Sequence, residues 1–129
     1  MENSYQFKKF TGRNARFEDR ITVTKSNTIG FPSKFYDDNG IKDFKFVIFF
    51  WDENKKAIGI QFTNSEEEKD KFSILHSNRG YGANVISRSF FRSNSIDPAT
   101  YSGRYNWKKH KIEGVGEIYV IELVEKKDK

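Results

Sequence analysis

The stretch Phe44-Lys45-Phe46-Val47-Ile48-Phe49-Phe50-Trp51 decides the fold class, because it is apolar at every position except Lys45. Aromatic and β-branched residues favour strands, and a strand that is apolar on both faces is covered on both, either by the core or by a partner chain. A polar turn at 52–56 leads into Ala57 to Phe62, where Ile58, Ile60 and Phe62 alternate. The two segments predict a β-hairpin.

The composition agrees with a β-rich core, since the 129 residues include 13 Phe and 6 Tyr. This length predicts one domain, 1–129. Cysteine is absent, which excludes disulfides and thiolate zinc sites and favours a cytoplasmic location. We expect no membrane association, because the N-terminus lacks the pattern of a signal peptide and no apolar run reaches about 18 residues.

Further elements flank this hairpin on both sides. Before it we expect a basic arm at 1–17, a strand at 21–24 and a helix from Pro32 to Asp38 with Phe35 facing the core. An acidic connection, 64–70, follows it. The second half then predicts a strand at 72–75, a helix capped by Ser87 and running to about Asn94, strands at 103–109 and 116–124, and a frayed tail at 125–129.

The two halves resemble each other at three places in the same order. Residues 21–27 align with 72–78, residues 35–41 with 90–96, and residues 58–62 with 119–123. The alignment predicts two strand-helix-hairpin repeats, 20–63 and 71–124, neither of which buries its hydrophobic face alone. The predicted fold is mainly β with two short helices (α+β), either β-barrel-like or a two-layer pseudo-dimer. The chain is then a monomeric pseudo-dimer or a homodimer.

Residues 20–63 resemble the AbrB and SpoVT family of swapped-hairpin DNA-binding domains. Phe31-Pro32 supplies the apolar-Pro step, Phe35 the buried helix position, Gly40-Ile41 the Gly-Ile pair, and residues 46–62 the hairpin. The resemblance implies that two units interleave into one β-barrel and that arginines around the turn and helix contact DNA. In this chain the turn reads Lys25-Ser26-Asn27-Thr28 and lacks those arginines. The second half follows this pattern only through the repeat, with Ser87 in place of the Pro and Ser95 in place of the Gly.

Positive charge is concentrated in the second half of the chain. The formal net charge is +5, yet residues 1–70 carry 12 basic and 12 acidic side chains, whereas residues 71–112 carry 8 basic ones against Asp97 alone. Such a run favours an anionic partner such as nucleic acid, or else forms an ordinary solvated basic face.

Basic and aromatic residues interleave within this run. In Arg79-Gly80-Tyr81-Gly82 the glycines allow a phosphate to approach the backbone while Arg79 pairs with it and Tyr81 stacks on a base, although a flexible turn explains the same residues. On a strand, Arg104, Asn106 and Lys108 share one face, and Tyr105 and Trp107 share the other, as stacking platforms or as core. The predicted nucleic-acid-binding residues are Arg79, Tyr81, Arg88, Arg92, Arg104, Lys108, Lys109 and Lys111.

Catalytic and metal chemistry have little support in this sequence. His76 and His110 are the only histidines, and neither has a carboxylate at a spacing typical of a catalytic triad or a metal site. We therefore predict no enzyme activity, no metal and no cofactor. The predicted function is nucleic-acid binding, for example by a small DNA-binding transcriptional regulator.

Two alternatives stay open at this point. One is a single-stranded nucleic-acid binder with exposed aromatic platforms. The other is a protein-interaction module, or a small inhibitory or accessory factor of a mobile element, that meets its partner through Phe46 to Trp51 or an edge strand. A folded structure discriminates between them: basic residues gathered on one concave face favour nucleic acid, and scattered ones favour a protein partner.

Overall fold

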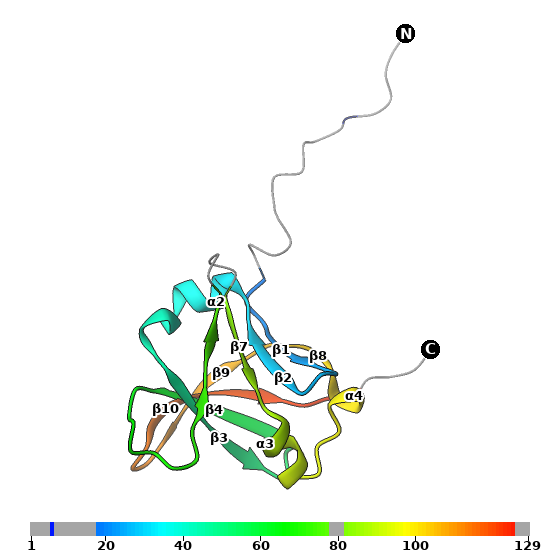
Figure 1. The fold of residues 1–129 in the computed structure, drawn as a ribbon. Helices are drawn as coiled ribbons and strands as arrows, with labels where there is room; N and C mark the ends of the chain where they lie inside the picture. The colour runs from blue at the N-terminus through cyan, green and yellow to red at the C-terminus, as the bar shows by residue number, and fades with distance from the viewer. Residues whose placement is uncertain (1–5, 7–17, 78–81, 126–129) are drawn as a thin grey trace.

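The computed structural model describes residue 6 and residues 18–77 and 82–125, which form two antiparallel five-stranded sheets (Figure 1). Sheet A has the strand order β6-β7-β2-β1-β8, and sheet B has the order β5-β3-β4-β10-β9. The predicted mainly β, α+β fold class is confirmed. Of the two predicted arrangements the chain adopts the two-layer one, because the sheets do not close into a barrel.

The strands of sheet A are β1 (Ile21–Thr24), β2 (Thr28–Phe31), β6 (Leu75–His76), β7 (Ala83–Ile86) and β8 (Gly103–Tyr105). The strands of sheet B are β3 (Phe46–Asp52), β4 (Ala57–Thr63), β5 (Phe72–Ser73), β9 (Lys108–Ile112) and β10 (Gly116–Glu122). The predicted hairpin at 44–62 is therefore confirmed as β3 and β4, which pair from Phe46↔Thr63 to Asp52↔Ala57.

Two predicted strands are each divided between the sheets. The segment 72–75 splits at Ile74 into β5 in sheet B and β6 in sheet A, and the segment 103–109 splits after Tyr105 into β8 in sheet A and β9 in sheet B. An apolar alternation continues through such a bend, because the chain passes from one layer to the other while keeping one face toward the core. Sequence periodicity therefore could not show where the sheet changes.

The helices are short, and they are α2 (Ser33–Asp38), α3 (Arg88–Ser93), α4 (Pro98–Tyr101) and the 3-10 helix η1 (Ile41–Asp43). Both predicted helices are present. Ser87 makes no side-chain cap to α3, which corrects that prediction: its hydroxyl donates to the Val85 carbonyl oxygen instead, at 3.0 Å. The additional helix α4 begins at Pro98 and is capped by Asp97, which accepts from the Ala99 amide at 3.1 Å.

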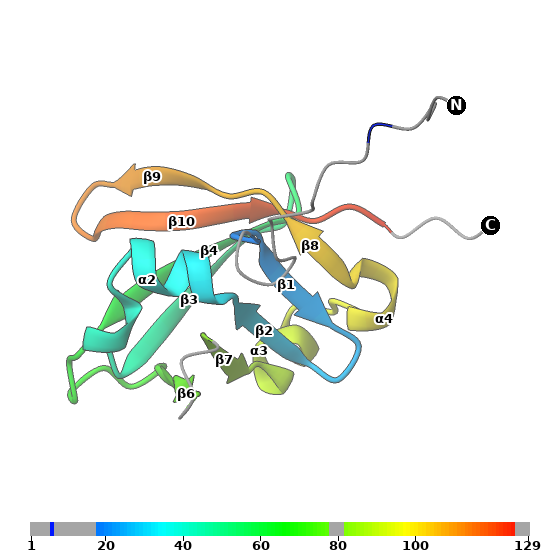
Figure 2. The same cartoon turned by 90° about the horizontal axis from the view of Figure 1, so that it is seen from above.

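The core lies between the sheets and is rich in aromatic rings. The Phe35 ring from α2 is fully buried, and it meets Trp107 and Tyr119 edge-on with ring centroids 5.1 Å apart in both cases. Figure 2 shows α2 beside the β9–β10 hairpin, which is how these rings meet. On α3 the Phe90 ring packs 4.7 Å from Phe49 of β3. Both α2 and α3 therefore bury aromatic side chains against sheet B.

The two halves contribute to both sheets in a matching way. In sheet A, β2 of the first half pairs with β7 of the second, and in sheet B, β4 pairs with β10. The ends of α2 and α3 also match: the Asn39 side-chain amide donates to the Phe35 carbonyl oxygen at 2.9 Å, and that of Asn94 donates to Phe90 at 3.0 Å. The repeat stays a prediction, and these shared features support it.

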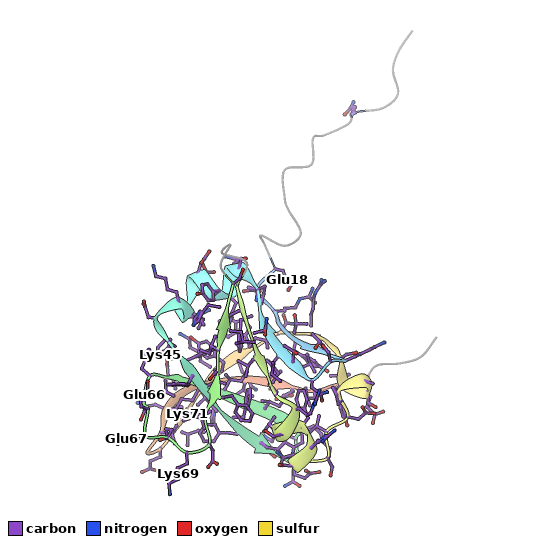
Figure 3. The ribbon with its side chains drawn as sticks, viewed as in Figure 1. Glu18, Lys45, Glu66, Glu67, Lys69 and Lys71 are labelled. Atoms are coloured by element: carbon purple, nitrogen blue, oxygen red, sulfur yellow. The ribbon has the colours of Figure 1, made fainter. Side chains whose placement is uncertain are left out.

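The acidic connection is held by lysine side chains. Lys71 donates to the backbone carbonyl oxygens of Glu66 and Glu68 at 3.0 and 2.8 Å, and Lys45 lies 3.8 Å from the Glu66 carboxylate. Figure 3 shows Lys45, Glu66 and Lys71 together at this loop, away from Glu18. These acidic side chains thus lie on a surface loop beside β3 and β5.

Candidate functional site

Sheet B has a second face, which is turned away from the core. Strand alternation points Val47 of β3 and Ile58 and Ile60 of β4 inward, where all three are fully buried. It points Phe46, Ile48 and Phe50 outward, where each is half-buried. Within the part of the chain that the structure describes, the core covers the inner face of this strand, and coverage of the outer face by a partner chain stays a prediction.

The outer face is hollowed near the middle of β4. Phe50, Gly59, Val120 and Lys108 form one row across β3, β4, β10 and β9. Gly59 has no side chain to fill the row, and a Cβ built there would lie 2.6 Å from Ile118 Cδ1 and 3.2 Å from Phe50 Cβ. The glycine allows its neighbours to close over the strand, so Ile118 is only 3% exposed.

Two adjoining hollows form a groove across this face, which we call the outer groove. One, of about 430 Å³, is lined by residues that include Phe50, Lys55, Gly59, His110 and Ile118. The other, of about 620 Å³, is lined by residues that include Arg104, Asn106 and Val124. Lys108, Val120 and Glu122 line both. The outer groove thus has an apolar floor and several charged side chains at its walls.

Of the predicted nucleic-acid-binding residues that the structure describes, Arg104 and Lys108 line this groove. They share it with Asn106, which the strand alternation predicted to lie on the same face. Lys109 and Lys111 are exposed on the opposite face of β9, where Lys109 Nζ lies 5.8 Å from the centroid of the Tyr119 ring.

The remaining predicted residues lie elsewhere. Arg88 and Arg92 are exposed on α3, whose first turn lies beside the β1–β2 turn because the Ser87 amide donates to the Asn27 carbonyl oxygen at 2.7 Å. Arg79 and Tyr81 lie outside the described residues. The predicted nucleic-acid-binding residues that the structure describes are therefore divided among three surfaces.

Acidic residues from distant parts of the sequence lie against the basic run. Lys108 Nζ is 3.5 Å from Glu122 of β10, and Arg104 is 3.9 Å from Glu18, which precedes β1. Glu18 is held more closely by Arg20, whose guanidinium donates to both of its oxygens at 2.8 and 2.9 Å and lowers its pKa to about 2. Within the described ranges, 15 basic side chains face 16 acidic ones. This part of the chain therefore carries no positive excess.

The aromatic residues of the run belong to the core. The Tyr105 hydroxyl donates to the Tyr101 carbonyl oxygen at 2.5 Å and accepts from the Val124 amide at 3.2 Å, while burial raises the pKa of Tyr105. Trp107 donates through Nε1 to the Asp19 carbonyl oxygen at 2.9 Å. Of the two readings given for these rings, the structure favours core, and neither ring is a free stacking platform.

The two histidines have different surroundings. His76 bridges α2 and the segment before β3, because Nδ1 lies 2.7 Å from the Tyr36 hydroxyl and Nε2 lies 2.8 Å from the Phe44 carbonyl oxygen. His110 is exposed on β9 and lines the outer groove. Among the described residues, no three His, Asp or Glu side chains gather as a metal site would require.

Sequence reasoning identified Arg104, Asn106, Lys108 and the apolar strand, but it missed the floor of the groove. Ile118 and Val120 of β10 were expected only as strand residues. They reach the outward side chains of β3 because β4 pairs with β3 on one side and with β10 on the other. No protein-family model, no curated protein and no solved structure matches this chain. No described helix is long and apolar enough to cross a membrane.

Proposed function

We propose that this protein is an interaction module that binds a segment of a partner protein in the outer groove. The observation that carries the proposal is the row Phe50, Gly59, Val120 and Lys108, in which a half-buried apolar strand lies opposite a basic one across a hollow. Exposed apolar side chains bordered by polar ones are typical of protein-binding surfaces.

The distribution of charge supports a protein partner over nucleic acid. A nucleic-acid interface needs several cations along one surface, because affinity comes mainly from neutralising phosphates. In the outer groove, Asp52 and Glu122 accompany Lys55, Arg104 and Lys108, so this surface is mixed rather than purely cationic. A polypeptide with both apolar and charged side chains matches it better.

Selection from a random peptide library displayed on phage tests the proposal without a known partner. We expect selected peptides to bind the wild-type protein and to lose at least about tenfold in affinity when Phe50 is replaced by Asp. Ile86→Asp is the matched control, since Ile86 is 59% exposed and lies on sheet A. Failure to enrich any peptide, or equal losses in both variants with unchanged melting temperatures, would refute the proposal.

Nucleic-acid binding is the second candidate function, and one observation favours it. Arg104, Asn106 and Lys108 line a single hollow of about 620 Å³, as a phosphate-tracking groove requires. The AbrB and SpoVT resemblance also stays a prediction, supported by the pairing of one hairpin from each half in both sheets. A small DNA-binding transcriptional regulator is the corresponding proposal.

Fluorescence anisotropy with labelled duplex and single-stranded DNA at about 50 mM salt tests this candidate. Binding that falls steeply with salt and is lost in Arg104→Ala/Lys108→Ala supports it. Arg88→Ala/Arg92→Ala removes the same charge from α3 and serves as the comparison. Absence of binding to both kinds of DNA would eliminate this candidate.

A further inference from the structure

The two walls of the outer groove differ in chemistry, and one half of the chain supplies each. The wall on β3 carries Phe50, whose side chain points outward. In sheet B, β3 and β9 lie at equal distances on either side of the β4–β10 pair, and β9 carries Lys108 opposite Phe50. One wall of the groove therefore carries the apolar Phe50 beside Asp52, and the opposite wall, which we call the cationic wall, carries Arg104 and Lys108 beside Glu122.

The cationic wall is available to an incoming anion. The side chains of Lys108 and Arg104 are 68% and 62% exposed, and their contacts with Glu122 and Glu18 are long, at 3.5 and 3.9 Å. Exposed ion pairs of this kind contribute only about 0–1 kcal/mol, so a carboxylate from a ligand can replace them. Glu18 keeps its two short bonds to Arg20 in any case, which leaves the Arg104 guanidinium able to reorient.

The spacing of the strands sets the length of ligand that contacts both walls. Neighbouring strands lie about 4.8 Å apart, so three spacings separate β3 from β9 by roughly 14 Å. An extended polypeptide advances about 3.3 Å per residue, so about five residues cross the groove. A short linear segment is therefore long enough to place an apolar side chain at Phe50 and a carboxylate at Lys108.

We propose, building on the proposed function, that the outer groove recognises an extended acidic-apolar peptide segment. Its large apolar side chains lie against Phe50 and Val120, and its carboxylates pair with Arg104 and Lys108. Charge complementarity carries this choice, because the two cations lie at the wall opposite the apolar strand, and bidentate pairing with carboxylates is a strength of arginine. The segment binds in one direction, with its acidic end toward β8 and β9.

A pair of synthetic peptides tests this inference by fluorescence anisotropy. Both are ten residues long, carry a fluorescein label and have three Leu residues at one end. At the other end, the Asp peptide has three Asp residues and the Lys peptide has three Lys residues. We expect the wild-type protein to bind the Asp peptide at least about tenfold more tightly than the Lys peptide, which corresponds to about 1.4 kcal/mol.

Charge reversal on the protein should exchange this preference. Arg104→Glu/Lys108→Glu is expected to bind the Lys peptide better than the Asp peptide, because the cationic wall becomes acidic. Lys109→Glu/Lys111→Glu is the matched control, with the same change in charge on the opposite face of β9, and it should keep the wild-type preference. Far-UV circular dichroism and thermal melting establish that both variants are folded.

The two proposals fail in different ways. Library-selected peptides that depend on Phe50 but show no preference for carboxylates overturn the acidic-apolar inference and leave the proposed function intact. The inference is also overturned if the Asp peptide does not bind, if the two synthetic peptides bind the wild type within about threefold of each other, or if the control variant exchanges the preference as well. A preference for duplex DNA over the Asp peptide, lost in Arg104→Glu/Lys108→Glu, likewise overturns it.

Discussion

Replacement of Phe35 by alanine tests the packing on which the whole molecule depends. Phe35 is fully buried, and its ring meets Phe31, Trp107 and Tyr119 with centroids between 5.1 and 5.5 Å apart. These partners come from sheet A, from the β8–β9 connection and from sheet B. Loss of the ring therefore leaves a cavity where both sheets and α2 meet.

The expected cost is about 3–5 kcal/mol, the range for Phe→Ala at fully buried positions. Phe35→Leu keeps most of the volume and should cost no more than about 1.5 kcal/mol. For a chain of 129 residues, a loss of about 4 kcal/mol lowers the melting temperature by roughly 15 °C. A small domain has only about 5–15 kcal/mol of stability, so the alanine variant should unfold at much lower denaturant concentration.

Urea unfolding followed by far-UV circular dichroism measures this difference. Tryptophan fluorescence is a second probe, although Trp107 lies against Phe35 and its native emission is expected to change in the variant. Ile86→Ala is the control, because Ile86 is 59% exposed and its truncation should stay within about 0.5 kcal/mol. A loss below about 1.5 kcal/mol for Phe35→Ala, with an unchanged urea dependence, would refute the close packing described above.

Three further perturbations test other features of the structure. Gly82→Ala should cost more than about 2 kcal/mol in urea unfolding, because its Cβ would lie 2.1 Å from the Phe31 carbonyl oxygen at φ +97°; Gly114→Ala, at φ +83° with open space around it, should cost only about 1 kcal/mol. Tyr105→Phe should cost about 1–2 kcal/mol in thermal melting, since its hydroxyl is bonded at both sides. Since Arg20 lowers the pKa of Glu18 to about 2, the stabilisation from this carboxylate is present above about pH 4.5 and is lost as pH falls toward 2. Because the two residues are close in sequence, part of the pairing survives unfolding. The difference in unfolding free energy between wild type and Glu18→Gln should therefore be larger at pH 5 than at pH 2.5, but by less than about 1 kcal/mol.

The β3–β4 hairpin and the helices α2 and α3 were predictable because their signals are local. Phe46–Asp52 and Ala57–Thr63 were found from continuous apolar residues and alternation, and α2 from Pro32 at its start. Strands β2 and β7 were missed, since each has only four residues and they pair with each other across the two halves of the chain. A pairing between residues more than fifty positions apart leaves no periodic signal in either segment.

The candidate site was predictable only in part. Arg104, Asn106 and Lys108 were expected on one face from strand alternation, and they line one hollow. Their neighbours Phe50 and Val120 come from β3 and β10, and no local pattern connects these strands to β9. Gly59 lines the same groove, and its missing side chain leaves the room in which Ile118 and Phe50 close over β4.

The sequence by itself determined a β-rich chain with an aromatic core and a basic run in the second half. Only the tertiary structure decided whether the basic residues of that run lie on one surface. Residues 71–112 are strongly basic along the chain, but folding places Glu122 beside Lys108 and Glu18 beside Arg104. It also places Arg88 and Arg92 on α3, and Lys109 and Lys111 on the face of β9 opposite Lys108. Electrostatic potential depends on distances in space rather than along the chain, so only the folded structure could show that the outer groove has a cationic wall opposite Phe50.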